Sequence, residues 1–387
     1  MVKHPTNSKP GIVMRHWIQI TAFLASCSLA QAFPVTGTKG TKLNATHIAT
    51  FNEAWAMTFL PDGSLLITEK SGKLFIVSPD GQKHVVTGLP SVTYGGQGGL
   101  GDIVLHPDFA NNHLIYFSYA ASQAGKNGAV LAHAKLNLDA NGTAKLRDVQ
   151  IIWQQSPKVL GRGHYSHRIA FGPKGSPHEG KLFITSGERQ KQDPAQDMKS
   201  SLGKIIRLND DGTVPKDNPW ADGSKGELAK TFWSLGHRNM LGIAFDTAGN
   251  LWSHEMGPRH GDELNLIKPG KNYGWPIVSE GNHYSGWPIP SHAKHPEFEP
   301  PKAFWVPTIA PSGLVIHSGK SHPDFRGNAF IGGLRSRAVI RVKLQGEKAS
   351  EIERFEWGKR IREVEEGPQG HLWVLEDQEG GRLLLLK

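Results

Sequence analysis

Two histidines stand in a glycine-rich turn near the middle of the chain, where either could act as a base. The segment reads Gly161-Arg-Gly-His-Tyr-Ser-His-Arg168 and is expected to lead into a strand over residues 168–171. An imidazole with a pKa of about 6.5 is neutral in part near pH 7, so His164 or His167 could accept a proton there. Loops held by rigid strands often carry such chemistry. The alternative is that both are polar surface residues on a turn.

Arginines and two amide side chains occupy short loops elsewhere in the chain. They are Gln97, Arg238, Asn239, Arg335, Arg337, Arg360 and Arg362, with Arg168 next to the histidines. A guanidinium group binds a carboxylate through two parallel hydrogen bonds, so several of them at one place would suit a small ligand with several carboxylates. Any one of these arginines taken alone is more simply a solvated surface residue. The functional interpretation therefore depends on whether the fold brings them together.

A second group of oxygen-bearing residues lies shortly after the loop that holds Arg238 and Asn239. Gly257-Pro258 forms a kink that leaves backbone carbonyls free, and Asp262 and Glu263 come shortly after it. Carbonyl and carboxylate oxygens are the ligands that Ca²⁺ prefers. The spacing is not that of an EF-hand, so this pattern alone does not identify a calcium site.

The elements that must position these residues repeat along the chain. An apolar strand, a turn containing Pro or Gly, and a second apolar strand recur from Ala56, Asp102, Arg168, Leu241, Gly313 and Arg362. Copies often end in a further strand, and repetition of a four-strand unit is the signature of a β-propeller. The six copies predict an all-β, six-bladed β-propeller. A strand near residues 42–51 is expected to close the ring against strands of the last copy.

The loop that precedes the first strand of a copy, called a leading loop below, is expected to reach the central axis. Five leading loops are expected, over residues 94–101, 161–167, 236–239, 305–312 and 359–362, and all but 305–312 carry residues introduced above. In a propeller they would converge on one end of the channel. Convergence would gather His164, the arginines and Gln97 into one site.

Composition agrees with many short strands and excludes some partners. The 387 residues include 45 Gly and 25 Pro, which favours tight turns over long helices. The formal charge is +9, but no run of five or more Lys and Arg occurs. We therefore expect a small anionic ligand rather than nucleic acid.

The N-terminus resembles an export signal. An apolar run covers residues 18–30, and a small-x-small cleavage site ends at Ala32. We predict a signal peptide over residues 1–32, with Met14 as an alternative start, and a single catalytic domain over residues 33–387. The mature chain is expected to lack a transmembrane span and to be periplasmic or secreted. Anchoring by a lipid on Cys27, the only cysteine, is the alternative.

Taken together and in order, these motifs resemble the soluble pyrroloquinoline-quinone (PQQ) dependent aldose sugar dehydrogenases of the glucose/sorbosone dehydrogenase family. The resemblance extends from about Trp55 to the C-terminus. Besides the turn around His164, it rests on Gly96-Gln-Gly-Gly-Leu100, His106-Pro-Asp-Phe109, Gly203-Lys-Ile-Ile-Arg-Leu208, Gly236-His-Arg-Asn239, Gly257-Pro258, Asp262-Glu-Leu-Asn265, Asn272-Tyr-Gly-Trp-Pro276, Pro307-Thr-Ile-Ala-Pro-Ser312 and Arg360-Ile-Arg362.

The resemblance implies a function and a role for particular residues. The family oxidises an aldose at the anomeric carbon to the lactone, with PQQ and Ca²⁺ as cofactors, and passes the electrons to an external acceptor. It implies that His164 is the base, that Glu188 orients it, and that Arg238 stabilises developing negative charge. The implied PQQ ligands are Gln97, Arg238, Asn239, Arg335, Arg360 and Arg362, and Arg335 stands where the family commonly has lysine. The implied calcium ligands are the carbonyls of Gly257 and Pro258 and, at a second position, Glu263 and Tyr273.

The chain departs from the family pattern beside the expected base. Many members have Gly-Gly where this chain has Ser166-His167, which narrows the site or places a second imidazole near PQQ. There is no Cys-x-x-Cys-His segment, so no fused haem carrier is expected. Two alternatives remain open from the sequence: a calcium-dependent, lactonase-like propeller hydrolase, and a non-catalytic propeller that binds glycans.

Overall fold

The computed structural model describes residues 1–2, 32–138 and 143–387. The chain divides into two units, Met1–Ala30 and Gln31–Lys387, and all the described strands belong to the second. The expected export signal, the alternative start at Met14 and Cys27 lie outside the described residues. In the described part of the chain, no helix combines the length and the apolar character needed to cross a membrane.

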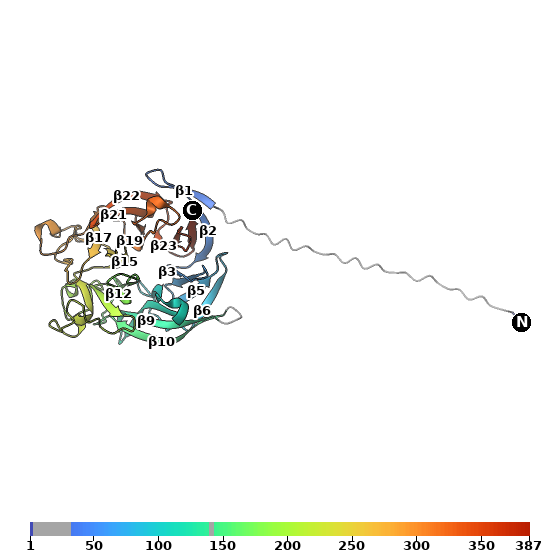
Figure 1. Cartoon of the computed structure of the whole chain (residues 1–387), viewed down its shortest axis with the longest axis horizontal. Coiled ribbons are helices and arrows are strands. Elements are labelled where there is room, and N and C mark those ends of the chain that lie inside the picture. The colour runs from blue at the N-terminus through green and yellow to red at the C-terminus, as the bar shows by residue number, and fades with distance from the viewer. Residues whose placement is uncertain (3–31, 139–142) are drawn as a thin grey trace. The chain divides into compact units, whose positions relative to one another are not determined.

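The regular secondary structure of the second unit consists almost entirely of β-strands, which confirms the all-β prediction (Figure 1). Its two ends share one sheet, in the order β1 (Ala32–Thr36), β2 (Lys42–Phe51), β25 (Gly381–Leu386), β24 (Leu372–Glu376) and β23 (Ile361–Glu366). Strand β2 pairs antiparallel with β25. This pairing confirms the expectation that a strand near residues 42–51 closes the structure against the last copy.

The largest sheet contains two consecutive antiparallel groups of four strands. The first is β3 (Ala54–Phe59), β4 (Leu65–Glu69), β5 (Lys73–Val77) and β6 (Lys83–Thr87). The second is β7 (Leu100–Leu105), β8 (Leu114–Gln123), β9 (Lys126–Leu138) and β10 (Ala144–Gln154), with the short helix α1 (Phe109–Asn112) after β7. A short parallel pairing of β6 with β10 joins the two groups.

Three further antiparallel sheets have four strands each. They are β11 (Ser166–Phe171), β12 (Lys181–Ser186), β13 (Lys204–Asn209) and β14 (Phe232–Leu235); β15 (Met240–Phe245), β16 (Leu251–Glu255), β17 (Asp262–Ile267) and β18 (Ala303–Trp305); and β19 (Pro311–Ile316), β20 (Asn328–Gly333), β21 (Ala338–Gln345) and β22 (Lys348–Glu356). Short 3-10 helices occupy the connections: η1 (Asp193–Ala195), η2 (Leu228–Thr231), η3 (His292–Lys294) and η4 (Pro323–Phe325).

The first strands of the four-strand groups form a closed ring of contacts. Strand β3 contacts β7, and the contacts continue through β11, β15 and β19 to β23, which contacts β3 again. Figure 1 shows these sheets arranged around a common centre. The core lies between neighbouring sheets, as where Trp252 packs with Ile331 and Ile340. Because every first strand faces the same centre, the loops that precede these strands meet at one end of it.

The strand after the histidine turn begins earlier than expected. Strand β11 starts at Ser166 rather than Arg168, and its pairing with β12 is irregular between Ser166 and Ile169. Ser166 and His167 have φ of 58° and 57°, in the left-handed region. This backbone interrupts the regular alternation of side chains at the place where the two histidines are presented.

Candidate active site

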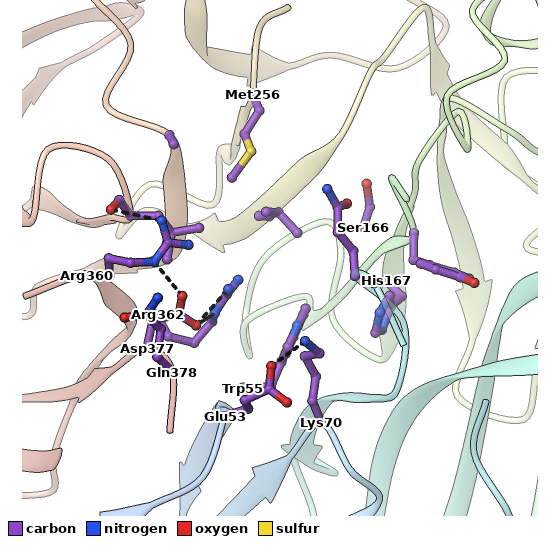
Figure 2. Close-up of a pocket in the computed structure, with 16 residues that line it drawn as sticks. Glu53, Trp55, Lys70, Ser166, His167, Met256, Arg360, Arg362, Asp377 and Gln378 are labelled. Atoms are coloured by element: carbon purple, nitrogen blue, oxygen red, sulfur yellow. Dashed lines mark hydrogen bonds and ion pairs between the residues drawn. The ribbon is translucent and has the colours of Figure 1, made fainter. Parts of the chain in front are cut away.

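One pocket lies where the leading loops meet. Its volume is about 430 Å³, and every first strand of the ring, or the loop before it, contributes to its wall. This axial pocket is lined by Glu53, Trp55, Lys70, Gly96, Gln97, Tyr165, Ser166, His167, Leu241, Met256, Ala310, Leu334, Arg360, Arg362, Asp377 and Gln378 (Figure 2). Four of the five expected leading loops line this pocket, whereas residues 236–239 line a neighbouring void instead.

His164 lies beside the axial pocket, and two neighbouring groups hold its ring and backbone. Its ring Nδ1 is 2.5 Å from Oε1 of Glu188, and its backbone N–H donates to Oε1 of Gln97 at 2.7 Å. Glu188 is itself fixed by the backbone N–H groups of Lys191 and Gln192. Since a carboxylate accepts at Nδ1, the proton of a neutral ring sits there, and Nε2 carries the lone pair.

Burial sets the ionisation of this pair. Burial lowers the pKa of His164, and the contact with Glu188 only partly opposes it. Burial would raise the pKa of Glu188, but its hydrogen bond and charge interaction with His164 outweigh that effect and lower it. At neutral pH the pair is a carboxylate beside a neutral imidazole, which is the state that a general base requires.

Two of the predicted arginines point toward one carboxylate in the pocket wall. Nε of Arg360 donates to Oδ2 of Asp377 at 2.8 Å, and Nε of Arg362 donates to Oδ1 at 2.9 Å. Burial would raise the pKa of Asp377, but the two guanidinium charges outweigh it and lower the pKa. Figure 2 shows this group on the opposite side of the pocket from Ser166 and His167. A cationic wall therefore faces the histidine turn.

The remaining predicted cofactor ligands differ in burial and in their position relative to the axial pocket. Arg238 is buried, and its Nη1 donates to the carbonyls of Met256 and Gly257 at 2.9 and 2.8 Å. Asn239 is buried next to Ser166, whose hydroxyl contacts its Oδ1 at 3.3 Å. Arg335 is exposed and does not line the axial pocket, so the structure does not bring it together with the others.

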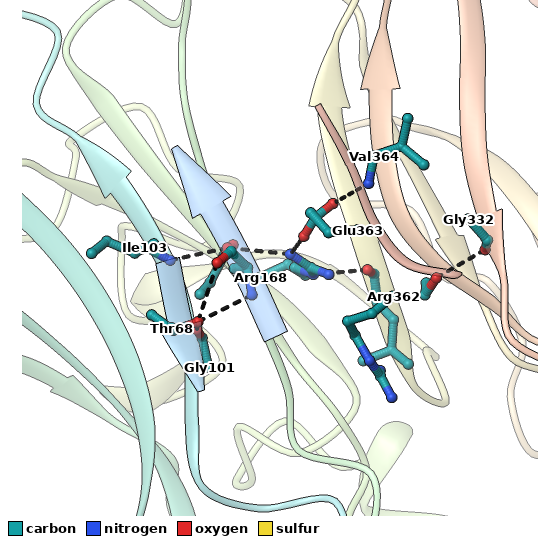
Figure 3. Close-up of polar contacts among 12 residues, drawn as sticks. Thr68, Gly101, Ile103, Arg168, Gly332, Arg362, Glu363 and Val364 are labelled. Atoms are coloured by element: carbon teal, nitrogen blue, oxygen red, sulfur yellow. Dashed lines mark hydrogen bonds and ion pairs between the residues drawn. The ribbon is translucent and has the colours of Figure 1, made fainter. Parts of the chain in front are cut away.

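Arg168 belongs to the packing beneath the pocket rather than to a ligand site. It is buried, it forms ion pairs with Asp102 and Glu363, and its Nε donates to the carbonyl of Leu241 at 2.9 Å. Figure 3 shows these polar contacts joining separate strands. Its guanidinium also lies over the Trp55 ring, 4.0 Å from the centroid. Arg168 is thus a structural cation that supports the wall of the pocket.

Three of the four predicted calcium ligands meet at a small void of about 10 Å³. Gly257, Glu263 and Tyr273 line it, together with Arg238 and Glu255, whereas Pro258 does not. In the described residues no three His, Cys, Asp or Glu side chains are grouped to hold a metal, so carbonyl oxygens would have to take part. The Tyr273 hydroxyl donates to the carbonyl of Leu266 at 2.6 Å. Its backbone oxygen, which lies 3.1 Å from Nε2 of His292, is the candidate ligand.

The chemistry of this void fits a cation. Burial raises the pKa of Glu263 well above its ordinary value, and the negative charge of Glu255 acts in the same direction. Asn265 donates to both carboxylates at 3.3 Å, while its own Oδ1 is buried without a hydrogen-bond partner. Oxygen atoms that crowd together in this way are stabilised by a divalent cation.

Asp262, the other carboxylate of the expected calcium pattern, is already fully engaged. Its Oδ1 accepts from the backbone of Gly257 at 3.0 Å, and its Oδ2 accepts from Ile309 and Ala310 at 2.7 and 2.8 Å and from the Thr308 hydroxyl. We therefore assign Asp262 to holding two loops together. Its side chain is not available as a calcium ligand.

Comparisons with known proteins identify the family. A model described as "Glucose / Sorbosone dehydrogenase" matches residues 51–385. The chain belongs to the glucose/sorbosone dehydrogenase family. It is 38% identical over 340 residues to aldose sugar dehydrogenase YliI of Escherichia coli, covering 85% of this chain and 88% of that protein. Membership confirms both the resemblance and the expected oxidoreductase class.

Solved structures of this family have the same fold. The apo-form of the soluble aldose sugar dehydrogenase from Escherichia coli superposes with a TM-score of 0.82 at 35% identity, covering 89% of this chain and 99% of that one. The PQQ-bound form of aldose sugar dehydrogenase from Streptomyces coelicolor gives a TM-score of 0.71 at 29% identity, covering 92% and 98%. This dehydrogenase is thus similar to proteins that are solved both without and with PQQ.

Several residues of the pocket were not found by sequence reasoning. Asp377 holds both arginines, Lys70 forms an ion pair with Glu53 at 2.8 Å, and Trp55 forms part of the wall. Lys70 and Asp377 each directly follow the second strand of a four-strand group. That shared position, at the pocket end of the second strand, is the signal that could have identified them.

Proposed function

We propose that this chain is a PQQ- and calcium-dependent aldose dehydrogenase that oxidises the anomeric carbon of a sugar to a lactone and passes the electrons to an external acceptor. The observation that carries the proposal is the placement of the His164–Glu188 pair beside a pocket whose opposite wall holds Arg360 and Arg362. A base facing a cationic wall suits a hydroxylated substrate next to a polycarboxylate cofactor.

The proposal includes a six-bladed propeller as its scaffold. Each antiparallel group of four strands would be one blade, and the group that combines β2 with β23–β25 would join the two ends of the unit. The closed ring of contacts from β3 to β23 supports this assignment. A propeller explains why residues from distant parts of the sequence face a single pocket.

The chain's own residues would bind, orient and exchange a proton. His164 would accept the proton of the anomeric hydroxyl at Nε2, while Glu188 holds the opposite nitrogen in the required tautomer. Arg360 and Arg362 would bind carboxylates of PQQ, and Gln97 and Asn239 would contribute neutral hydrogen bonds. When bound, PQQ supplies the two-electron acceptor and Ca²⁺ supplies Lewis-acid polarisation.

Arg238 and the neighbouring void complete the proposal. Arg238 would stabilise negative charge that develops on an oxygen in the transition state. Glu263, with the carbonyls of Gly257 and Tyr273, would hold Ca²⁺, and we keep Pro258 as a further carbonyl ligand. Arg335 is the weakest member of the expected set because it is exposed and does not line the pocket.

Reconstitution tests the proposal directly. Metal-free protein is mixed with PQQ, CaCl₂, glucose and an artificial electron acceptor, and reduction of the acceptor is followed by absorbance. We expect reduction only when PQQ and Ca²⁺ are both present, and its loss in His164→Ala. Hydrolysis of a lactone without PQQ, and no acceptor reduction with a panel of aldoses, would instead establish the hydrolase alternative. Sugar binding that is equal in wild type and His164→Ala, without turnover, would establish the glycan-binding alternative.

A further inference from the structure

The second imidazole of the histidine turn, His167, is built into the wall of the axial pocket. Its ring stacks on Trp55 with centroids 4.9 Å apart and an interplanar angle of 12°. Gly101 faces the ring edge so closely that a Cβ there would lie 1.9 Å from Cε1 of His167. The Thr68 hydroxyl fixes Gly101 by donating to its carbonyl at 2.7 Å (Figure 3). The orientation of the ring is therefore set on both its face and its edge.

Hydrogen bonds to Ser118 determine which ring nitrogen carries the proton. Ser118 Oγ lies 2.7 Å from Nδ1 of His167, 2.7 Å from the backbone carbonyl of the same residue, and 2.9 Å from the backbone N–H of Asp102. The carbonyl can only accept, so the single hydroxyl proton of Ser118 is used there. Nδ1 must then donate to Oγ, which leaves Nε2 as the nitrogen with the lone pair.

The ring stays neutral in the range where such enzymes work. Burial lowers the pKa of His167 to about 3, and the charges of Arg168 and Arg189 act in the same direction. Within the described residues, Nε2 has no hydrogen-bond partner. His167 lines the axial pocket and is only 1% exposed, but its Nε2 is not completely buried. Figure 2 shows His167 on the pocket wall next to Ser166.

We infer that His167 is a specificity-determining residue whose Nε2 accepts a hydrogen bond from a ligand hydroxyl in the axial pocket. The inference rests on the proposed function, under which two ligands offer such a hydroxyl: the reduced, quinol form of PQQ and the aldose. Oxidised PQQ has carbonyl oxygens at the positions where the quinol has hydroxyls. A fixed acceptor therefore favours the quinol over the quinone, or one hydroxyl arrangement of the sugar over another.

The first test measures the tautomer in the ligand-free protein and needs no activity. Nitrogen-15 NMR of the labelled protein, assigned by loss of the signals in His167→Phe, should show a protonated Nδ1 and an unprotonated Nε2. A protonated Nε2 would overturn the inference. This result is independent of whether the chain binds PQQ, so it separates failure of the inference from failure of the proposed function.

The second test compares ligands in wild type and His167→Phe, which keeps a ring to stack on Trp55. Anaerobic calorimetric titrations use oxidised and reduced PQQ, and steady-state assays with glucose give KM and kcat. If His167→Phe loses about 3- to 10-fold in affinity for reduced PQQ alone, the inference is supported and the ligand is the quinol. If its KM for glucose rises by a similar factor while kcat is unchanged, the inference is supported and the ligand is the sugar. The inference would be overturned if His167→Phe lost affinity equally for both forms of PQQ with an unchanged KM for glucose. It would also be overturned if neither affinity nor KM changed. Wild type that binds neither PQQ form would contradict the proposed function instead.

Discussion

Replacement of Arg360 and Arg362 by alanine should abolish most of the affinity for PQQ. Both guanidinium groups line the axial pocket and converge on Asp377, and the side chain of Arg362 is only 13% exposed. A hydrogen bond to a charged group contributes about 1.5–3 kcal/mol. Two such bonds to carboxylates of PQQ correspond to about 3–6 kcal/mol, or roughly a 10²- to 10⁴-fold rise in Kd.

Arg335→Ala is the matched control because it makes the same substitution at an exposed position outside the pocket. Isothermal titration of PQQ into calcium-loaded protein gives Kd for wild type, Arg335→Ala and Arg360→Ala/Arg362→Ala. We expect an unchanged Kd in the control and a large rise in the double variant. Circular dichroism of each ligand-free protein establishes that the fold is kept.

Stability of the ligand-free double variant gives a second readout. The lowered pKa of Asp377 contributes stability that is present above its unfolded pKa and lost as pH falls through the folded value. Without the arginines that contribution disappears, so urea unfolding at pH 7 should show a loss of about 1–3 kcal/mol. If the double variant binds PQQ as wild type does, or if Arg335→Ala has the larger effect, the assignment of the cationic wall is wrong.

Four further predictions rest on individual contacts. His164→Ala should keep PQQ affinity, measured by titration, and lose about 10²- to 10⁴-fold in kcat. Because burial lowers the pKa of His164, the kcat/KM of wild type should hold below pH 6.5 and fall only at more acidic pH, as the imidazole becomes protonated. Gly101→Ala should cost about 1–3 kcal/mol in urea unfolding because its Cβ meets His167, and Gly101→Ala/His167→Gly should recover part of that loss. Glu263→Gln should remove the rise in thermal midpoint that CaCl₂ gives wild type, whereas a calcium response equal to that of wild type would show that the void is not the site.

The order of the strands could be predicted because it depends on local patterns. Apolar runs that are broken by Pro-Asp or Pro-x-Gly turns specify short strands wherever they occur, and their repetition specifies equivalent positions. Strand β2 pairs with β25 as expected because the last copy lacks a strand of its own there. The start of β11 was missed because Ser166 adopts a positive φ, which its residue type does not indicate.

The positions of the loops could be predicted, but the directions of their side chains could not. Arg335, Arg360 and Arg362 all belong to segments near the axis, yet only the last two face the pocket. Arg360 and Arg362 both donate to Asp377. The position of Asp377 after β24 could have marked it as a pocket residue, but nothing in the sequence indicates that it pairs with these two arginines. Asp262 fits a calcium ligand by type, and only its contacts with residues 308–310 show that it holds a loop instead.

The two histidines also have different environments because of side-chain directions that the sequence does not indicate. On a regular strand, residues 164 and 167 would face opposite sides, but left-handed residues interrupt the strand between them. Glu188 fixes the ring of His164, and Ser118 fixes that of His167, so each imidazole has its Nδ1 occupied and its Nε2 free of protein partners in the described residues. A carboxylate partner stabilises the positive charge that an imidazole acquires when it gains a proton. A neutral hydroxyl partner provides no such stabilisation. We therefore propose that the difference between these partners, more than the positions of the histidines, assigns the role of base to His164 and that of acceptor to His167.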